Sequence, residues 1–266
     1  MQEEKRAMEN TLDADQRWEQ WENIPCGQKE NKAFAAMPRY QTIEVELLGG
    51  EIRPGEDGTG PRVGKPAYGS LRDLPLETEE PMRKEARKEV IESLRHAKEQ
   101  GEETMLMVSG PFTVLSGLVS MERIFVERRK NPELYRQALN WVSRQLISYM
   151  KQAAPLVSLY SIADPAASPK IVGKVCVQEL VREAYLPLLR EVTSWGKPVH
   201  LCPRLAAGVL SEEGIEKETR RLPRAMNYEE ALLCFKNQGV LLAGACIKTG
   251  DEVISYEELG IWRIRE

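Results

Sequence analysis

Three residues of this 266-residue chain have the types and spacing of a metal site. His200 and Cys202 lie two positions apart in a short apolar run, and Cys246 ends a second apolar run that begins at Val240. If both runs are strands of one sheet, the three side chains can meet at the same end of that sheet. Two thiolates and one imidazole form a borderline-soft ligand set, which selects zinc over magnesium or calcium.

The number of ligands indicates what such a zinc ion would do. Three protein ligands leave a fourth position open, which is the arrangement of a catalytic site. Because two thiolates cancel the charge of the ion, a bound substrate thiolate makes the centre electron-rich, and its sulfur stays nucleophilic at a lowered pKa. This chemistry suits attack on an alkyl carbon better than activation of water. The alternative is a core histidine beside a small buried cysteine, which needs no metal.

The local geometry of the pair sets a condition for this site. Alternate side chains of a strand point to the same face but stand about 6.5–7 Å apart, so His200 and Cys202 need a bend to share one ion. Pro203 follows directly and favours a bend at the end of the strand. The sequence therefore predicts a metal site at a strand end.

Two further strand ends carry candidate residues. Gly110 follows the apolar run 104–108, and Asp164 follows the apolar run 156–162. Parallel α/β proteins place ligand-binding loops and catalytic side chains after the carboxyl ends of their strands. Gly110 and the nearby Phe112 are therefore candidates for a binding loop, and Asp164 is a candidate functional acid. For Asp164 the alternative is an N-cap or a turn residue ahead of a proline.

The rest of the chain alternates between helical and strand patterns. Helical spacing of apolar residues recurs in three segments, which are residues 80–101, 131–154 and 175–195. Their alternation with the apolar runs favours a parallel sheet or barrel with outer helices. Helices are also predicted around residues 211–221 and 228–237, and residues 43–48 are predicted to form a short strand or an irregular loop.

The composition argues against several classes of protein. A net charge of −4 disfavours a nucleic-acid binder, which usually carries a basic stripe. No apolar run is long enough to span a membrane, and the charged first residues lack the apolar core of a signal peptide. The five cysteines are therefore expected to be reduced thiols in the cytoplasm. Cys176 and Cys234 lie in helical stretches and are expected to pack in the core.

The order of several short segments along the chain indicates a resemblance to a known family. They are residues 44–74, 109–113 (SGPFT), 162–168 (IADPAAS), 185–187 (YLP), 199–202 (VHLC) and 242–246 (LAGAC). In this order they resemble the uroporphyrinogen decarboxylase superfamily, and within it the corrinoid-linked methyltransferases of the methylcobamide:coenzyme M type. The resemblance covers much of residues 40–250.

The resemblance implies a fold and a reaction. The fold is an α/β TIM-type (β/α)8 barrel with its site at the carboxyl ends of the strands. The reaction moves a methyl group between a thiol, or another small acceptor or donor, and the methylcobalamin of a partner corrinoid protein. Zinc held by His200, Cys202 and Cys246 would activate the thiol. Asp164 falls where the family keeps an acid facing the pocket, and it is expected to position or deprotonate the acceptor or donor.

The chain also departs from the family pattern. Too few residues separate Cys202 from Cys246 for the usual number of strand–helix units, so the barrel is expected to be shortened or irregular. Residues 1–266 are expected to form this single domain, with residues 1–75 as a helical or irregular covering segment. Arg204 stands near a position where the family commonly has glycine. It can bind an anionic acceptor or corrinoid group, or it can be a surface arginine.

Two other functions remain open from the sequence. One is a decarboxylase of the parent type, which needs no metal. The arginine-rich motif that binds substrate carboxylates in that branch is not recognisable here, which disfavours porphyrinogen decarboxylation. The other is a non-catalytic subunit that binds a corrinoid protein and uses its zinc only structurally.

Overall fold

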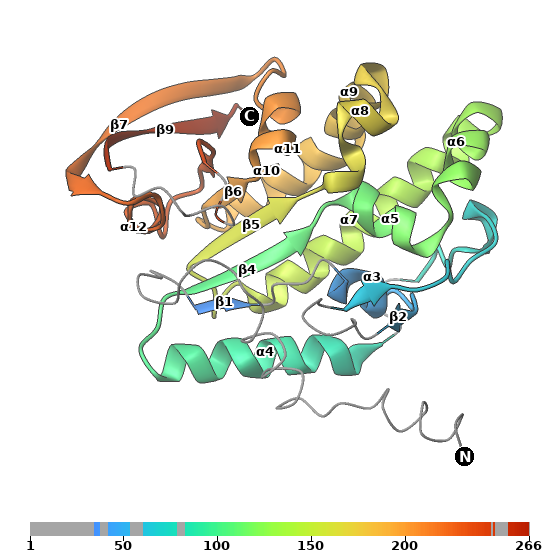
Figure 1. Cartoon of the computed structure of the whole chain (residues 1–266), viewed down its shortest axis with the longest axis horizontal. Helices are drawn as coiled ribbons and strands as arrows, with labels where there is room; N and C mark the ends of the chain where they lie inside the picture. Colours follow the sequence, from blue (N-terminus) through green and yellow to red (C-terminus); the bar gives the residue numbers. More distant parts are fainter. Residues whose placement is uncertain are drawn as a thin grey trace.

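The structure is a computed structural model, and it describes residues 35–37, 42–53, 61–78, 83–245, 247 and 255–265. Within these residues a seven-stranded sheet runs through the molecule in the order β1-β4-β5-β6-β8-β9-β7 (Figure 1). Its strands are β1 (Ala35–Met37), β4 (Thr104–Ser109), β5 (Leu159–Ala163), β6 (Val199–Leu201), β8 (Leu241–Leu242), β9 (Tyr256–Ile264) and β7 (Ile215–Met226). A separate antiparallel pair is formed by β2 (Ile52–Arg53) and β3 (Arg62–Val63).

The winding of the sheet is that of a barrel. β1, β4, β5, β6 and β8 are parallel, and each pairs with the next one along the chain. A doubly wound sheet reverses its strand order at a switch point, whereas a TIM-type barrel adds each new strand on the same side of the last. The chain therefore has the predicted α/β fold of the TIM-barrel type.

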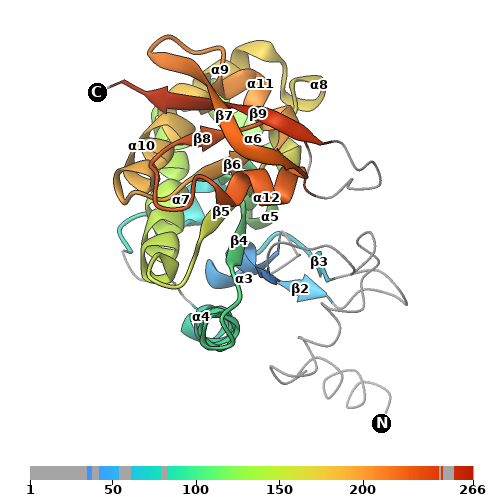
Figure 2. The same cartoon turned by 90° about the vertical axis from the view of Figure 1, so that its left-hand side faces the viewer.

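Closure is where the fold departs from a regular barrel. Beyond β8, the next strand in the sheet is the antiparallel β9, which pairs in turn with the long antiparallel β7. Among the described residues β1 and β7 form the two edges of the sheet and do not pair with each other. Figure 1 and Figure 2 show the β7–β9 ribbon at the opposite side of the molecule from α4 (Lys84–Glu99). The barrel is thus shortened and irregular, as the short interval between Cys202 and Cys246 predicts.

Helices connect the parallel strands and cover the sheet. Besides α4 they are α3 (Ile43–Leu47), α5 (Pro111–Leu118), α6 (Met121–Lys130), α7 (Pro132–Ala153), α8 (Pro169–Val172), α9 (Lys174–Leu180), α10 (Leu186–Ser194), α11 (Pro203–Val209) and α12 (Tyr228–Leu233). The described residues also form two 3-10 turns, η2 (Leu71–Asp73) and η3 (Pro165–Ala167), and the π-helical turn η4 (Val181–Tyr185). Within the described part of the chain, no helix combines the length and the apolar character needed to cross a bilayer.

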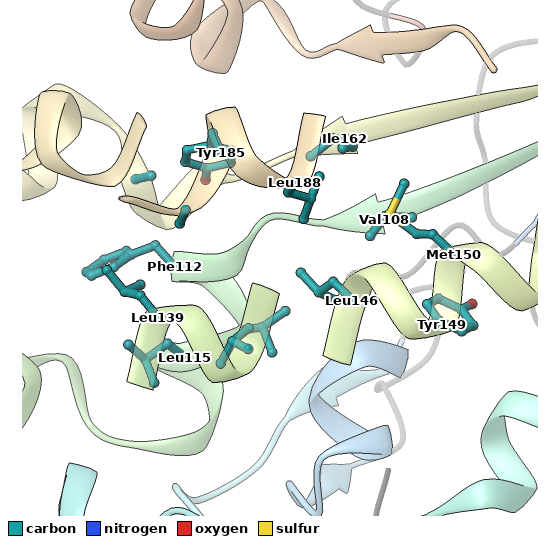
Figure 3. Packing of buried hydrophobic residues seen from close by; sticks show 14 of the residues in the cluster. Val108, Phe112, Leu115, Leu139, Leu146, Tyr149, Met150, Ile162, Tyr185 and Leu188 are labelled. Atoms are coloured by element: carbon teal, nitrogen blue, oxygen red, sulfur yellow. The ribbon is translucent and has the colours of Figure 1, made fainter. Parts of the chain in front are cut away.

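The main hydrophobic core lies between the sheet and its helices. Figure 3 shows Val108 of β4 and Ile162 of β5 among Leu146 and Met150 of α7 and Leu188 of α10, and all five are buried. Full burial of one such side chain contributes about 1.5–3 kcal/mol. A smaller buried cluster on the other face joins the sheet to α12, β7 and β9. β4 and β5 thus pack against helices through Val108 and Ile162, and against the second cluster through Met105 and Leu159 near their amino ends.

Most of the long elements confirm the sequence prediction. α4 lies within residues 80–101, and α7 lies within residues 131–154. Pro132 occupies the first turn of α7, where its missing N–H would have no helical partner anyway. Asn131 is the N-cap residue as predicted, although its side chain makes no capping hydrogen bond. Long periodic helices are thus the part of the fold that local pattern predicts best.

The prediction of a helix at residues 211–221 is wrong, because β7 occupies most of that stretch. β7 is an edge strand exposed over most of its length, so its sequence lacks the alternation of a half-buried strand. Its buried residues Leu222 and Met226 lie beyond the predicted helix, and residues 215–221 include no buried residue at all. Pro223 lies at a break in the pairing with β9, where an edge strand tolerates a missing N–H.

The prediction of a strand or loop at residues 43–48 is also wrong, since α3 is a short helix. All but one of its residues are buried, so it has no exposed face that would reveal a helical pattern in the sequence. Gly49, with a φ of 90°, follows the helix in a conformation that favours glycine. Gly50 lets the chain turn back, because a Cβ there would lie 2.3 Å from Cγ1 of Val45.

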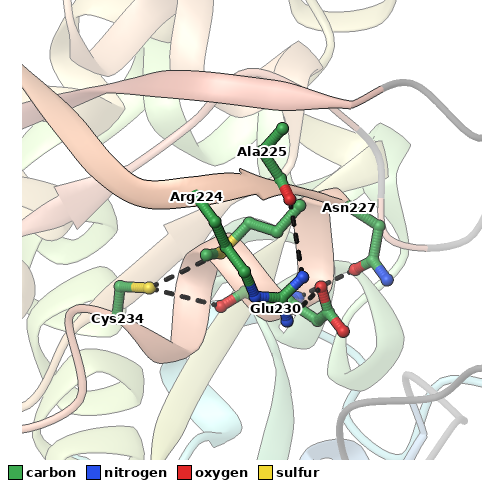
Figure 4. Close-up of polar contacts among 6 residues, drawn as sticks. Arg224, Ala225, Asn227, Glu230 and Cys234 are labelled. Carbon is green, nitrogen blue, oxygen red and sulfur yellow. Dashed lines mark hydrogen bonds and ion pairs between the residues drawn. The ribbon is translucent and has the colours of Figure 1, made fainter.

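Helix α12 confirms the helix expected at residues 228–237 but ends earlier. Asn227 caps it by accepting a hydrogen bond from the N–H of Glu230 at 2.9 Å (Figure 4). Arg224 at the end of β7 forms an ion pair with Glu230 at 3.4 Å. These contacts join the edge strand to the helix that follows it.

The two cysteines expected in the core differ from each other. Cys176 of α9 is buried, as predicted. Cys234 is exposed, so the prediction that it packs in the core is wrong. It follows the last turn of α12, where its thiol donates to the carbonyl oxygen of Glu230 at 3.7 Å (Figure 4).

The predicted covering segment, residues 1–75, falls largely outside the described residues. Of the part that the structure describes, β1 belongs to the parallel sheet itself. Tyr68 forms a single parallel bridge with Val119 after α5. The remaining extent of the covering segment stays a prediction.

Candidate functional site

Asp164 is the centre of a buried hydrogen-bond cluster at the carboxyl ends of β4 and β5. Its Oδ1 accepts from the N–H and the hydroxyl of Thr113, at 2.9 and 2.6 Å, and from the N–H of Ala167 at 3.1 Å. Its Oδ2 accepts from the N–H of Phe112 at 2.9 Å and from the hydroxyl of Tyr185. A carboxylate offers roughly four lone-pair positions, so these donors saturate it.

The same side chain caps the turn that follows it. Asp164 is the N-cap residue of η3, and its bond from Ala167 is the capping bond. The N-cap that the sequence offered as the alternative is therefore confirmed, while a catalytic role stays a prediction. Burial raises the pKa of Asp164, and the hydrogen bonds from Thr113, Tyr185 and the backbone oppose that rise.

A break in helical regularity brings Tyr185 to this carboxylate. The five residues of η4 form a π-helical turn, whose closing N–H bonds a carbonyl five residues back. Pro187 gives the physical reason, because a proline has no N–H and its ring clashes with the carbonyl four residues earlier. Such π-helical turns are rare and are frequently found at functional sites.

Gly110 is required by the close approach of this cluster to the backbone. A Cβ at Gly110 would lie 2.4 Å from Oδ2 of Asp164 and 2.7 Å from the hydroxyl oxygen of Tyr185. The structure thus brings the predicted residues Gly110, Phe112 and Asp164 together. Phe112 contributes its N–H, while its buried ring belongs to the core, with a centroid 6.3 Å from that of Phe125.

His200 is buried one strand further along the sheet, on β6. It pairs in register with Ser161 of β5, whose Oγ lies 2.9 Å from the Nδ1 of His200. The Nε2 lies 3.1 Å from the carbonyl oxygen of Ala245, and the ring of Tyr228 meets the imidazole edge-on at 5.8 Å. Burial lowers the pKa of His200 to about 4, so the ring is neutral near pH 7.

The structure describes two of the three predicted zinc ligands. Cys202 directly follows β6 as the N-cap residue of α11, and its thiol is free and only partly buried. Cys246 lies outside the described residues. Among the residues that are described, no group of three His, Cys, Asp or Glu side chains is arranged to hold a metal ion. The zinc triad therefore stays a prediction.

Arg204 is the remaining predicted binding residue. It is exposed in the first turn of α11, two residues after Cys202. α11 packs beside η3, the turn that Asp164 caps. Arg204 thus lies on the side of the sheet where the strands end, and its binding role stays a prediction.

Sequence reasoning assigned no role to Ser161 or Tyr185, although both contact predicted site residues. Ser161 is a polar residue inside an apolar run, and only the register of β5 against β6 shows that it faces His200. For Tyr185 a signal was available, because Pro187 interrupts a helical stretch.

Comparison with known proteins agrees with this arrangement. The family model described as uroporphyrinogen decarboxylase (URO-D) matches residues 34–213, which is more than half of the chain. The match includes the ends of β4, β5 and β6 and therefore Asp164 with its donors, His200 and Ser161, but not Tyr228 or Ala245, which also contact His200.

Two curated proteins of Methanosarcina species are similar in sequence. A methylated-thiol–coenzyme M methyltransferase of Methanosarcina mazei is 26% identical over 172 residues, covering 63% of this chain and 46% of the relative. A methylcobamide:CoM methyltransferase of Methanosarcina barkeri is 23% identical over 180 residues, covering 66% of this chain and 52% of the relative. The chain spans about half the length of these curated relatives.

One solved structure shows the same fold. It is a methyltransferase from Methanosarcina mazei, with a TM-score of 0.54 at 24% identity, covering 67% of this chain and 54% of that one. The family match spans the parallel strands β1, β4, β5 and β6 and the hydrogen-bond cluster around Asp164. The protein therefore belongs to the uroporphyrinogen decarboxylase family.

Proposed function

We propose that this chain is a zinc-dependent methyltransferase that moves a methyl group between a corrinoid protein and a thiol, or another small acceptor or donor. The names of the two curated relatives pair coenzyme M with a methylated thiol in one case and with a methylcobamide in the other. These names support a corrinoid as one partner and a sulfur compound as the other.

The observation that carries this proposal is the position of His200. Its ring lies on β6 one residue before the strand ends, with Nδ1 beside the hydroxyl of Ser161 and Nε2 directed at the carbonyl oxygen of Ala245, the residue before Cys246 in the sequence. Metal-binding histidines almost always have one ring nitrogen fixed by a hydrogen bond while the other faces the ion. His200 has such a fixed nitrogen, and the free thiol of Cys202 lies two residues later.

We assign the zinc to His200, Cys202 and Cys246. Imidazole and thiolate are common zinc ligands, and three of them leave one position open. When bound, zinc would lower the pKa of a coordinated substrate thiol, so that its sulfur is a nucleophile at neutral pH. The protein itself contributes a fixed, neutral imidazole and an accessible thiol at the same strand end.

The other predicted residues act around that centre in this proposal. Asp164 positions the methyl acceptor or donor by holding Gly110 and the first turn of α5, since five donors already engage its oxygens. Gly110, the N-cap residue of α5, and the N–H of Phe112 in its first turn shape the floor of the binding site. Arg204, exposed on α11, binds an anionic group of the acceptor or of the corrinoid.

The proposed partner is a corrinoid-binding protein, and the proposed compartment is the cytoplasm. Three cysteines of the described residues, Cys176, Cys202 and Cys234, are free thiols, which fits a reducing compartment. Methylcobalamin would arrive on the partner protein.

The test combines metal content with a methyl-transfer assay on the full chain. Purified protein is expected to bind about one zinc ion per chain, as one three-ligand site requires. It is expected to demethylate free methylcobalamin in the presence of one member of a panel of small thiols. Cys202→Ala should lose the zinc and the activity together, while Cys234→Ala, which removes an exposed thiol elsewhere, should keep both.

Each rival function has a distinct outcome. Protein that lacks zinc and is unaffected by Cys202→Ala contradicts the proposal and favours a metal-free decarboxylase. Protein that binds zinc, unfolds on chelation and demethylates no methylcobalamin with any thiol is instead a binding subunit with a structural metal.

A further inference from the structure

The two hydrogen-bond partners of His200 decide which ring nitrogen carries the hydrogen. The Nε2 lies 3.1 Å from the carbonyl oxygen of Ala245, and a carbonyl oxygen can only accept. In this structure Nε2 therefore carries the ring hydrogen and donates it to Ala245. The Nδ1 is then the bare nitrogen, and it accepts from the hydroxyl of Ser161 at 2.9 Å.

A metal ion on His200 requires the opposite arrangement. An imidazole binds a metal through a nitrogen that carries no hydrogen, and the other nitrogen then carries it. The Nδ1 faces Ser161 on the neighbouring strand inside the sheet, where both side chains are buried. The Nε2 faces the carbonyl oxygen of Ala245 in the segment after β8 and not the neighbouring parallel strand, so Nε2 is the nitrogen available to an ion.

Ser161 is suited to both arrangements because a hydroxyl can donate as well as accept. We propose that Ser161 is a positioning residue that holds His200 in either tautomer, so that Nε2 can exchange the carbonyl of Ala245 for a metal ion. This inference rests on the zinc site of the proposed function. An alanine could not hydrogen-bond Nδ1 in either tautomer. A carboxylate or carbonyl could only accept, so it could bond Nδ1 only in the metal-bound state, where Nδ1 carries the hydrogen.

Exchange of the Ala245 carbonyl for a metal ion does not change the number of hydrogens on the ring of His200. The neutral ring loses the hydrogen on Nε2 and gains one on Nδ1, so His200 releases no net proton. The hydroxyl of Ser161 turns about its Cβ–Oγ bond and changes from donor to acceptor. Any protons released on zinc binding come from the thiols of Cys202 and Cys246, which must ionise to bind the ion.

The chain is well suited to a direct measurement of the ring hydrogen. It contains only two histidines, and the other, His96, lies exposed on α4. Full-length protein labelled with ¹⁵N-histidine gives one set of ring signals for each, and His96→Gln assigns them. Long-range ¹H–¹⁵N spectra should show the hydrogen of His200 on Nε2 without metal and on Nδ1 after zinc is added.

Variants of Ser161 test its role by affinity. Ser161→Ala should weaken zinc binding about 10–100-fold, the usual effect of removing a partner that orients a metal ligand. Ser161→Thr keeps the hydroxyl in a residue that suits strands and should restore most of the affinity. Ser143→Ala is the matched control, since Ser143 is buried on α7 and its hydroxyl has no hydrogen-bond partner among the described residues. It should leave zinc affinity unchanged.

The outcomes separate this inference from the proposed function. Zinc that binds stoichiometrically while the hydrogen stays on Nε2, or binds equally well to Ser161→Ala, overturns the inference and leaves the zinc site standing. Failure of the wild-type chain to bind zinc at all overturns both. The spectra of wild-type protein decide the question even if Ser161→Ala does not fold.

Discussion

Asp164 and Glu44 are both buried carboxyl residues, with exposed fractions of 4% and 1%, yet they are held in opposite ways. Asp164 accepts hydrogen bonds from donors on α5, η3 and η4. Neither carboxyl oxygen of Glu44 on α3 has a hydrogen-bond partner among the described residues. Burial raises the pKa of Glu44 to about 7, and the nearby polar groups of Ser109 oppose this only in part.

The difference shows what allows a carboxylate to be buried. Removing an anion from water is very unfavourable unless donors replace the lost hydration. At Asp164 the protein supplies those donors from three elements, so the charge ties the loop after β4 to the turn after β5. At Glu44 only the nearby polar groups of Ser109 and the backbone offset the burial, so the protonated form is favoured below about pH 7. Burial raises the pKa of both acids, but the two predict opposite responses to mutation: loss of the Asp164 carboxylate should destabilise the fold, whereas neutralising Glu44 should stabilise it above the pKa of that glutamate.

Removal of the Asp164 carboxylate should have the largest effect on stability. Asp164→Ala leaves its buried donors without an acceptor and is expected to destabilise the fold by about 4–5 kcal/mol, as for other broken buried charge networks. Urea unfolding followed by circular dichroism measures this change. Asp164→Asn keeps the shape and should fall in between.

Exposed Asp73 provides the control for that experiment. Asp73→Ala should change stability by less than about 0.5 kcal/mol, as is usual for surface positions. A loss of similar size in both variants would show that the donors around Asp164 are not what stabilises this strand end.

The second effect concerns Glu44 and depends on pH. Its folded pKa of about 7 lies above the ordinary glutamate value of 4.5, so its contribution to stability is fully present below about pH 4.5 and is lost as pH rises through about 7. Glu44→Gln removes this titration. Because one pKa unit corresponds to about 1.4 kcal/mol, the variant should exceed wild type by on the order of 3 kcal/mol at pH 8, relative to their difference at pH 4.5.

The measurement is the free energy of unfolding in urea at several pH values. Glu46→Gln replaces a partly exposed glutamate on the same helix and serves as the control. A gap between variant and wild type that does not grow with pH, or that grows equally for Glu46→Gln, would contradict the assignment to Glu44.

Gly110→Ala tests the close packing around Asp164 without removing any hydrogen-bonding group. The added Cβ would overlap the carboxylate and the hydroxyl of Tyr185. We expect a loss of about 2 kcal/mol, in the range for overpacked sites. Gly69→Ala is the matched change, since its nearest neighbour is Oδ2 of Asp73, at 3.3 Å on a flexible exposed side chain. Equal stability of the two variants would mean that the loop after β4 can move away from Asp164.

The smallest predicted effect comes from a single hydroxyl. Tyr185→Phe removes one donor to Asp164 and should cost about 1.5–2 kcal/mol, as for a hydrogen bond to a charged group. Tyr149→Phe removes an equally buried hydroxyl that has no hydrogen-bond partner among the described residues, and it should be neutral or slightly stabilising. Thermal unfolding of both variants gives the comparison, and a larger loss in Tyr149→Phe would reverse it.

Local pattern predicted the helices and strands that are long or fully buried, and it failed where an element has no contrasting face. The buried α3 is a helix where the pattern predicts a strand or loop, and the exposed β7 is a strand where the pattern predicts a helix. In both cases the residues on opposite sides of the element meet the same environment. Periodicity is then absent, because it records only a difference between a buried and an exposed side.

The sequence by itself determined that a histidine, a cysteine and an aspartate follow apolar runs, and that their order resembles one family. It also determined that the barrel is short, because the interval from Cys202 to Cys246 is a property of the chain alone. These conclusions need only residue type and distance along the chain, which no folding step changes.

Only the tertiary structure decided the partners of these residues. The register of β5 against β6 places Ser161 on His200, and the π-helical turn at η4 brings Tyr185 to Asp164. A shift of either strand by one residue would turn Ser161 or His200 to the other face of the sheet. Such contacts join segments far apart in the chain, and their geometry is set by how the helices and strands pack together.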